Sequence, residues 1–389
     1  MSSPILLQGI RVLDCTSVIF GPFATQMLAD LGAEVIKIEP PSGDMFRYSA
    51  KPAASKGMSP GHLALNRGKR SVALDLKLSA ELEIVRALLP TCDVFIHNMR
   101  AQAIERLGLG YEAVRALRPD CVYAHCVGFG SDGPYAGLQA YDDLIQAASG
   151  TTSLIGKVDG DGRPRYLPGA IADKVCGLYA AQGVLAALIH RLRTGEGQFV
   201  EIPMFETFTH FSLVEHLAGM TFDPPNGPIC YGRQIDPDRQ PFPTSDGHIA
   251  IVPYSDAAWQ PVFAILGDEA FLQNAELSTP LLRFRNISLL YQRIAALTPA
   301  HTSAHWVARF RAADIPSIAV RAIEDILADP HLRATHFFQR QVHPSEGAVF
   351  AMRCPLRFGV GRGADEPRFA PQLGEHTQAV RDEAATAGM

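Results

Sequence analysis

Short apolar runs and amphipathic stretches alternate through the first half of the chain. Residues 10–15 (IRVLDC) and 34–39 (EVIKIE) are short segments rich in Val, Ile and Leu that suit strands, and apolar side chains recur at helical spacing over residues 21–31 between them. Gly32 supplies the stop after this helix. A strand, a helix and a strand within about thirty residues predict a right-handed crossover that joins two parallel strands.

The same alternation continues as far as residue 204. Further strands are predicted at 70–75, 93–97, 121–127 and 198–202, and the longest helix at 171–192. Strands that alternate with helices indicate an α/β fold with a mainly parallel sheet. Ligands bind such sheets beyond the carboxyl ends of the strands. Polar clusters follow three of these ends, at residues 17–19, 98–100 and 128–134.

The composition changes between residues 223 and 247, where Pro, Gly, Asp and Arg accumulate. Such a stretch is typical of a linker and surface loop that lead into a second domain. A compact, mostly helical unit with a little sheet is expected beyond it. Its predicted elements are a strand at 248–252, helices at 259–266, 285–297 and 303–312, then a strand at 316–323 and a helix at 323–328.

Composition and charge exclude several classes of function. Hydrophobic residues make up 47% and charged residues 19% of the 389, as in soluble globular proteins. The net charge of −5 argues against a nucleic-acid-binding protein, which usually carries a basic surface. No apolar run reaches membrane-spanning length, and the N-terminus lacks the pattern of a secretory signal. We therefore expect no nucleic-acid partner and no membrane partner.

The cysteine, histidine and glycine patterns narrow the cofactor chemistry. Seven scattered cysteines include no CxxC pair, so neither a disulfide framework nor a structural zinc site is predicted, and a reducing cytoplasm is expected. The 13 histidines include one HxxxH spacing, at His301 and His305, and no metal site is expected. The turn at residues 16–22 lacks GxGxxG, so a nicotinamide or flavin cofactor is not expected.

A basic turn before one strand is a candidate binding element. Asn66–Arg70 brings Arg67, Lys69 and Arg70 together within five positions. Their charged N–H groups can donate hydrogen bonds to a phosphate. A solvated basic loop has the same composition, and the sequence of the turn alone favours that structural alternative.

An acidic residue opens the longest predicted helix. Asp173 is either a cap or first-turn acid, which the spacing favours, or a nucleophile. As a nucleophile, its carboxylate would be kept ionised by the helix N-terminus and would attack an acyl carbon. Tyr141 and Asp142 open an earlier helix, where the acid complements the helix dipole or the pair faces the same cavity as Asp173.

Several segments together resemble the class III CoA-transferases (CaiB/BaiF type), the family that includes formyl-CoA transferase and α-methylacyl-CoA racemase. The segments are residues 28–39 (LADLGAEVIKIE), 43–45 (GDM) with Arg47, 66–75 (NRGKRSVALD), Asn98, 172–173 (AD), 193–198 (RTGEGQ), 246–247 (DG) and 373–377 (LGEHT). Each segment is modest alone, but the ordered set is highly specific and extends from the first strand to the C-terminus.

The resemblance implies an architecture. It implies a Rossmann-like large domain built from both ends of the chain, a small α+β domain, and two subunits that interlock as a homodimer. With the change in composition at residue 223, we expect a large CoA-binding domain over residues 1–222, a small domain with its linker over 223–322, and a return to the large domain over 323–389.

The resemblance also implies site residues. The family's catalytic aspartate falls on Asp173, and a tyrosine followed by an acid near the nucleophile of formyl-CoA transferase falls on Tyr141 and Asp142. Positions that contact coenzyme A fall at or near Val18, Arg67, Lys69, Arg70, Asn98 and Arg106. Coenzyme A is therefore expected as a substrate, in the form of an acyl-CoA.

Two departures from the family pattern bear on the reaction. The racemase branch has a histidine where this chain has Tyr141, and racemisation needs an acid and a base on opposite faces of the α-carbon. Tyr141 therefore favours a transferase. Formyl-CoA transferase has a run of four glycines as a lid, which this chain lacks, and this argues against oxalyl and formyl substrates.

The implied reaction moves CoA from an acyl-CoA to a carboxylic acid through an anhydride and a CoA thioester on Asp173. Small dicarboxylates such as succinate are expected because many relatives use them. Arg47 and Arg233 are candidate partners for a distal carboxylate, although Arg233 also suits a surface loop. The alternatives are an acyl-CoA racemase or isomerase of the same family, and a non-catalytic acyl-CoA-binding protein, against which Asp173 argues.

Overall fold

The computed structural model describes residues 6–359 and 368–387. The chain forms two compact units. The first comprises Met1–Thr151, Tyr166–Ser212 and Pro330–Met389, and the second comprises Thr152–Arg165 and Leu213–Asp329. The second unit therefore includes a segment before the long helix, and its longer segment begins ten residues before the composition change at residue 223.

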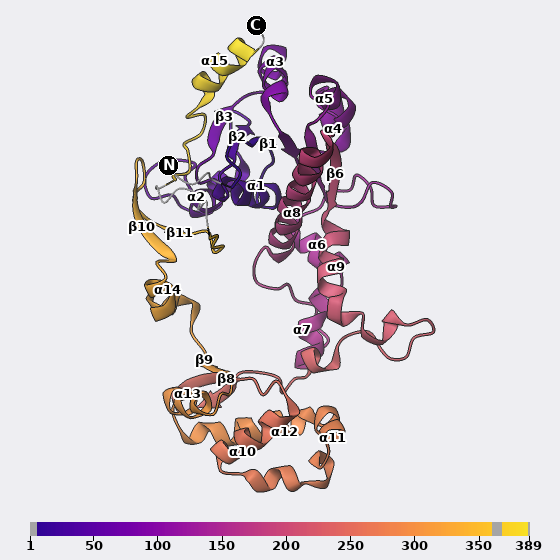
Figure 1. Cartoon of the computed structure of the whole chain (residues 1–389), viewed down its shortest axis with the longest axis vertical. Coiled ribbons are helices and arrows are strands. Elements are labelled where there is room, and N and C mark those ends of the chain that lie inside the picture. The colour runs from indigo at the N-terminus through magenta and orange to yellow at the C-terminus, as the bar shows by residue number, and fades with distance from the viewer. Residues whose placement is uncertain (1–5, 360–367, 388–389) are drawn as a thin grey trace. The chain divides into compact units, whose positions relative to one another are not determined.

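The first unit is built on a six-stranded parallel sheet (Figure 1). Its strands are β1 (Arg11–Cys15), β2 (Glu34–Glu39), β3 (Arg70–Ala73), β4 (Val94–His97), β5 (Val122–Val127) and β6 (Gln198–Pro203). Their order across the sheet is β3-β2-β1-β4-β5-β6, and every neighbouring pair is parallel. This is the doubly wound order, and it confirms the predicted Rossmann-like α/β fold.

Helices cover both faces of the sheet because successive strand residues point to opposite sides. Val12 of β1 belongs to the core beneath α1 (Phe20–Asp30) and α8 (Ile171–Thr194), whereas Leu13 belongs to the core beneath α3 (Ser79–Leu88) and α15 (Thr377–Ala387). Both side chains are completely buried. A strand buried on both faces is mostly apolar, and the one acid within β1, Asp14, is buried with hydrogen bonds from Thr16.

The order of the strands creates an opening at one edge of the sheet. The chain leaves β1 toward β2 and β3, then returns to form β4 on the other side of β1. The loops after β1 and β4 therefore diverge, and ligands bind at such a switch point in open α/β sheets. Two of the predicted polar clusters, residues 17–19 and 98–100, lie in these two loops.

The longest helix, α8, lies beside β6 in Figure 1 and packs closely on α1. A Cβ at Gly177 would lie 2.9 Å from the carbonyl oxygen of Phe20, so a larger residue would force the two helices apart. Gly195 ends the helix with a φ of 78°, a left-handed conformation that suits glycine. These small and terminal residues fix where the helix begins and ends relative to the sheet.

By length and composition alone, α8 could cross a membrane, which corrects the expectation that no segment reaches that length. Within the fold, 44% of its apolar window is buried. Core helices of soluble proteins pass the same test, so this one helix is weak evidence for a membrane span.

The remaining elements of the first unit connect and cover this core. They are α2 (Pro60–Leu65), α4 (Ala101–Arg106), α5 (Tyr111–Leu117), α6 (Asp142–Ala148), α14 (Pro330–Ala334) and the antiparallel pair β10 (Phe338–His343) and β11 (Gly347–Met352). The boundary between the units falls within α9 (Met204–His216).

The second unit has its own core around Trp259, Phe263 and Trp306. Its antiparallel strands are β7 (Phe242–Thr244), β8 (Gly247–Ile251) and β9 (Ser317–Ala319), and its helices are α7 (Thr152–Asp159), α10 (Trp259–Leu266), α11 (Pro280–Arg285), α12 (Ile287–Leu297) and α13 (Ser303–Ala312). Small antiparallel strands with several helices agree with the predicted α+β class.

Two element predictions in this unit were wrong. The predicted strand at 316–323 is only the three residues of β9, because that strand pairs with β8 over those residues alone. The segment Ile323–Ala328 is a helix with the predicted bounds, of the 3-10 type. The predicted helix at 285–297 starts only at Ile287, because the chain bends at Asn286 between α11 and α12.

Candidate active site

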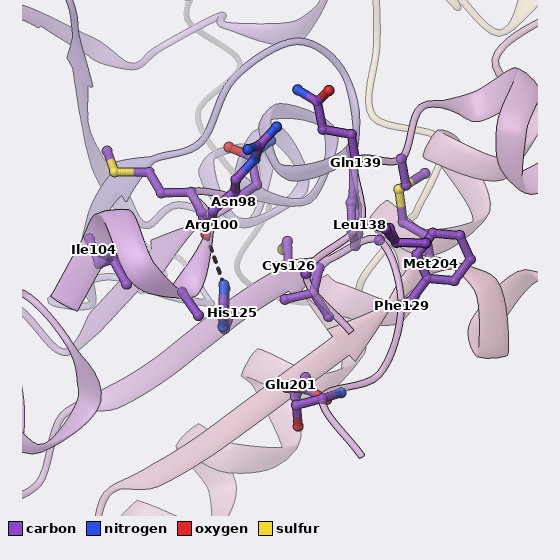
Figure 2. A pocket seen from close by; sticks show the side chains of 18 of the residues that line it. Asn98, Arg100, Ile104, His125, Cys126, Phe129, Leu138, Gln139, Glu201 and Met204 are labelled. Carbon is purple, nitrogen blue, oxygen red and sulfur yellow. Dashed lines mark hydrogen bonds between the residues drawn. The ribbon is translucent and has the colours of Figure 1, made fainter. Parts of the chain in front are cut away.

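A cavity of about 860 Å³ opens at the carboxyl ends of the central strands, within the first unit. Figure 2 shows Asn98 and Arg100 on one side of it and Leu138, Gln139 and Met204 on the other. The loops after β1, β4 and β5 supply most of its wall. The cavity therefore occupies the position that the topology of the sheet predicts for a ligand.

Asp173 lies in the wall of this cavity, in the first turn of α8. The residue in the cap position of the helix is Ala170, so Asp173 is not the N-cap. Within the described part of the chain, no side chain or backbone group donates a hydrogen bond to its carboxylate. Of the two structural roles considered for Asp173, the cap is absent, whereas its position as an acid in the first turn of the helix is as expected.

The carboxylate of Asp142 occupies the position of a cap for the same helix. Its Oδ1 accepts the backbone N–H of Asp173 at 3.0 Å, and its Oδ2 accepts a hydrogen bond from Gln146 Nε2 at 2.6 Å. An acceptor at a free helix N–H stabilises the start of a helix. Asp142 thus joins α6 to α8 and brings a second negative charge close to Asp173.

Burial and this neighbouring charge change the acidity of Asp173. Burial, followed by repulsion from the Asp142 carboxylate, raises the pKa of Asp173 to about 7. Burial and the Asp142 charge therefore act against the expected effect of the helix N-terminus, which would keep this carboxylate ionised. Around neutral pH, the group is divided between a nucleophilic carboxylate and a neutral acid.

Tyr141 lies directly before α6 and lines the same cavity, with its side chain 54% exposed. Val18 and Asn98, two of the predicted CoA-contacting residues, line the cavity as well. The structure thus brings Asp173, Tyr141, Val18 and Asn98 to one site, although they lie as far apart as 155 positions in the sequence. Asp142 contacts the site through the backbone of Asp173.

The three cations of the predicted phosphate turn are paired within the protein. Arg67 donates to Asp30 at 3.1 Å, and Lys69 is buried with its ammonium nitrogen 2.8 Å from Thr25 Oγ1 and 3.4 Å from Asp14 Oδ2. Burial lowers the pKa of Lys69 to about 8.

The third cation of the turn, Arg70, forms ion pairs with Glu34 at 2.7 Å and Glu383 at 2.5 Å. None of the three lines the cavity beside Asp173. Their contact with coenzyme A remains a prediction.

The remaining predicted binding residues lie elsewhere. Arg47 is buried, and its guanidinium donates to both carboxylate oxygens of Glu39 at 2.7 Å, which leaves it no free face for a substrate. Arg106 is exposed on α4 and donates to the backbone carbonyl of Gln102 at 3.2 Å. Arg233 belongs to the second unit, where its Nε donates to the Tyr291 hydroxyl at 3.1 Å.

Arg100 is a site residue that the sequence analysis did not single out. It is the one Lys or Arg side chain among the described residues that line the cavity, and it is exposed. The sequence offered a signal, since Arg100 ends the polar cluster at residues 98–100 after a predicted strand. The family resemblance points instead to Arg106, six positions further along the chain, as the residue that contacts coenzyme A.

Within the described residues, no cluster of three or more His, Cys, Asp or Glu side chains is arranged to hold a metal ion. The chemistry derived for this site therefore concerns the chain's own side chains. Among the described residues, its defining features are a half-buried carboxylate without a hydrogen-bond donor, a tyrosine at the cavity wall and one guanidinium without an acidic partner.

The doubly wound sheet and the cavity at its switch point define an α/β enzyme with an acidic group at the start of a core helix. A model of the CoA-transferase family III matches residues 7–377, and the chain belongs to this family. The expected family is thus confirmed, and the protein is a CoA-transferase enzyme.

Similar proteins extend over nearly the whole chain. The succinate–glutarate CoA-transferase of Agrobacterium fabrum is 32% identical, over 98% of this chain and 96% of its own length. The formyl-CoA:oxalate CoA-transferase of Streptomyces coelicolor is 31% identical, over 96% of this chain and 94% of its own. A crystal structure of a CaiB/BaiF family protein from Brucella suis superposes with a TM-score of 0.83 at 28% identity, covering 99% of this chain and all of the other.

Proposed function

We propose that this enzyme transfers CoA from an acyl-CoA thioester to a short dicarboxylic acid, with Asp173 as the nucleophile. The observation that carries the proposal is the carboxylate of Asp173, which lies in the cavity wall without a hydrogen-bond donor among the described residues. A carboxylate that is not held by the protein is free to attack an electrophile.

The chemistry proceeds through covalent intermediates. The Asp173 carboxylate attacks the thioester carbonyl, the C–S bond breaks, CoA leaves as its thiolate, and a mixed anhydride remains. The thiolate then attacks the aspartyl carbonyl of the anhydride, which releases the donor acid as a carboxylate and leaves an aspartyl-CoA thioester. The acyl-CoA and the acceptor acid supply all the atoms that are exchanged, and no further reactant is needed.

The second half of the reaction repeats these steps in reverse. The acceptor carboxylate attacks the aspartyl-CoA thioester and forms a new anhydride, with release of the thiolate. The thiolate attacks the acyl carbon of the acceptor, which yields the new acyl-CoA and restores the Asp173 carboxylate. Water would hydrolyse each intermediate, so the walls of the cavity have to exclude it.

Arg100 supports the binding of a substrate with negative charge. A guanidinium binds phosphate and carboxylate oxygens through paired N–H groups, and Arg100 has no acidic partner among the interactions that the structure describes. We assign it to the phosphates of coenzyme A, because CoA is common to both halves of the reaction. The choice of dicarboxylates is supported by the names of similar proteins, including the succinate–glutarate CoA-transferase.

The test is an exchange assay with purified protein. Succinyl-CoA is incubated with a panel of mono- and dicarboxylic acids that includes glutarate, and mass spectrometry identifies each new thioester. We expect glutaryl-CoA, and we expect the Asp173→Ala protein to form none. Undiminished exchange by Asp173→Ala would exclude the proposed nucleophile, and turnover of monocarboxylates alone would exclude the substrate class.

One observation favours a second reaction, proton exchange at the α-carbon of an acyl-CoA. A group with a pKa of about 7, as for Asp173, suits general acid–base catalysis at neutral pH. Incorporation of deuterium from solvent into the acyl-CoA, measured in the same samples, would identify a racemase or isomerase. CoA binding by calorimetry without either reaction would identify a non-catalytic acyl-CoA-binding protein.

The expected homodimer and cytoplasmic location form a further part of this proposal. Apolar side chains of α8 are exposed in the single chain, among them Leu178, Ile189 and Leu192, and such a surface favours association. Sedimentation analysis would show the dimer, and a fluorescent fusion in cells would show the location.

A further inference from the structure

The loop that follows β1 is held by side chains at almost every polar backbone atom. The Asn98 side-chain amide accepts the N–H of Ser17 and donates to the carbonyl of Ser17, both at 3.0 Å. The Thr16 N–H donates to Asp14 at 2.9 Å, and the Thr16 carbonyl accepts from the Lys37 ammonium at 2.8 Å. This part of the cavity wall is therefore fixed before any ligand binds.

Val18, the next residue of the loop, has an unusual backbone conformation. Its φ is +70°, in the left-handed region, although it is a β-branched residue. Such strain persists only where surrounding contacts impose it, and it is concentrated at functional sites. Val18 also lines the cavity beside Asp173, so its conformation determines the shape of the wall.

The backbone N–H of Val18 is bound by a residue of a buried ion pair. The N–H of Val18 donates to both carboxylate oxygens of Asp44, at 3.1 and 3.0 Å. Asp44 Oδ2 in turn lies 3.1 Å from the Lys37 ammonium. Both side chains are almost completely buried, with exposures of 4% for Asp44 and 1% for Lys37.

The charges around Lys37 favour its ionised form. Burial lowers the pKa of Lys37, but the carboxylates of Asp14, Asp44 and Glu39 together outweigh burial, and the net effect is a raised pKa. The cation therefore remains in place across the physiological pH range. Burial of a charged pair of this kind costs free energy, so its presence is weak evidence that it serves only to stabilise the fold.

We propose that Asp44 and Lys37 are positioning residues that hold Val18 in its left-handed conformation and so form the wall against which the acyl-CoA binds. Neither residue lines the cavity, and both act through the backbone of the loop. This inference rests on the proposed function, because acyl-CoA is the ligand. It predicts that substitutions in the pair weaken the affinity for CoA and leave the rate of the chemical step nearly unchanged.

A purely structural role for Asp44 has to be distinguished from this one. Asp44 also caps the 3-10 helix Met45–Tyr48, since its Oδ1 accepts the N–H of Phe46 at 3.0 Å. Loss of the cap would destabilise the protein whatever residue occupies position 18. The positioning role, in contrast, depends on the strain at Val18, and glycine would remove that strain because it adopts left-handed conformations readily.

A double-mutant cycle separates the two roles. The proteins are wild type, Asp44→Asn, Val18→Gly and the double variant, with Asp44→Asn chosen because asparagine keeps one acceptor oxygen. We measure KM and kcat for transfer from succinyl-CoA, and the Kd for CoA by calorimetry. Asp44→Asn is expected to raise KM and Kd about tenfold in the Val18 background and less than about twofold in the Val18→Gly background, with kcat nearly unchanged.

Equal factors in the two backgrounds, or a loss confined to kcat, would overturn the proposal. Asp93→Asn is the matched control, because Asp93 forms a similar ion pair with Arg191 at 2.7 Å and does not line the cavity. It is expected to lower the melting temperature and leave KM unchanged. If Asp44→Asn fails to fold alone, its rescue by Val18→Gly supports the proposal. If neither folds, the same cycle with Lys37→Met decides between the roles.

The calorimetric Kd keeps this test separate from the proposed function. A wild-type protein that binds CoA without transferring it would contradict the proposed function, yet the coupling between positions 44 and 18 would still appear in the Kd. A wild-type protein that transfers CoA but shows no coupling would contradict the positioning role alone.

Discussion

Two carboxylates beside the same cavity have opposite surroundings. Asp44 accepts hydrogen bonds from Val18 and Phe46 and pairs with Lys37, so its charge is fully compensated. Asp173 has no donor among the described residues, and its pKa is raised to about 7. The difference indicates a division of roles, because the fold places its polar partners where the wall must be rigid and leaves the reactive group uncompensated.

The largest effect in this comparison is expected for Asp173→Asn. Transfer should fall at least about 1000-fold because an amide does not form the anhydride. Stability should rise in parallel, by about 1–2 kcal/mol above pH 7, a value discounted for the partial exposure of the side chain. Urea unfolding of both proteins at several pH values measures this gain.

The sign of the pH dependence follows from the raised pKa. Asp173 holds its proton up to about pH 7 in the folded protein and loses it near pH 3.8 in the unfolded chain. Its destabilising effect therefore grows between these two values and is absent below the lower one. The gain from Asp173→Asn should vanish below about pH 4. An equal gain in the free energy of unfolding at pH 4 and pH 8 would show that the charge of Asp173 does not destabilise the folded protein.

A smaller effect, on KM for the acyl-CoA, is expected from the removal of a cation that lines the cavity. Arg100→Ala should raise KM for the acyl-CoA about tenfold or more and leave kcat nearly unchanged, because the contact to CoA is the same in both halves of the reaction. Arg67→Ala removes a cation that already has Asp30 as its partner, and KM should change less than about twofold. Initial rates over a range of succinyl-CoA concentrations measure both.

The outcome decides between the cavity and the basic turn as the phosphate site. If Arg67→Ala raises KM as strongly as Arg100→Ala, the turn predicted from sequence contacts the phosphates after all. In that case the Arg67–Asp30 ion pair has to open when CoA binds. Thermal unfolding of both variants controls for a general loss of structure.

The strands and the long helix were predictable because their signals are local. The role proposed for Asp173 came from the family resemblance, since its spacing alone favours a cap or first-turn acid. A short segment rich in Val and Ile such as residues 34–39 favours a strand, and the structure has that strand with the same ends. The pairing of charges was not predictable. Arg70 meets Glu383 across 313 positions, and the pKa of Asp173 depends on how α6 packs against α8. Such contacts arise from tertiary packing, about which periodicity contains no information.

The smallest expected effect isolates the charge of Asp142. In Asp142→Asn the side-chain oxygen still accepts the N–H of Asp173, while the repulsion between the two carboxylates disappears. The pKa of Asp173 should therefore fall, but it should remain above its ordinary value because burial is the larger cause. The acid limb of kcat/KM, measured from pH 5 to 9, should move to lower pH by up to about one unit, with kcat at pH 8 changed only a few-fold.

Asp143→Asn is the control for this shift, because Asp143 is exposed on the same helix and is expected to leave the profile unchanged. Asp142→Ala sharpens the interpretation, since it removes both the charge and the acceptor for the helix N–H. A loss of kcat in Asp142→Ala that is absent from Asp142→Asn would assign the hydrogen bond to the orientation of Asp173. An unmoved acid limb in both variants would show that another group, and not Asp173, controls the ionisation of the active enzyme.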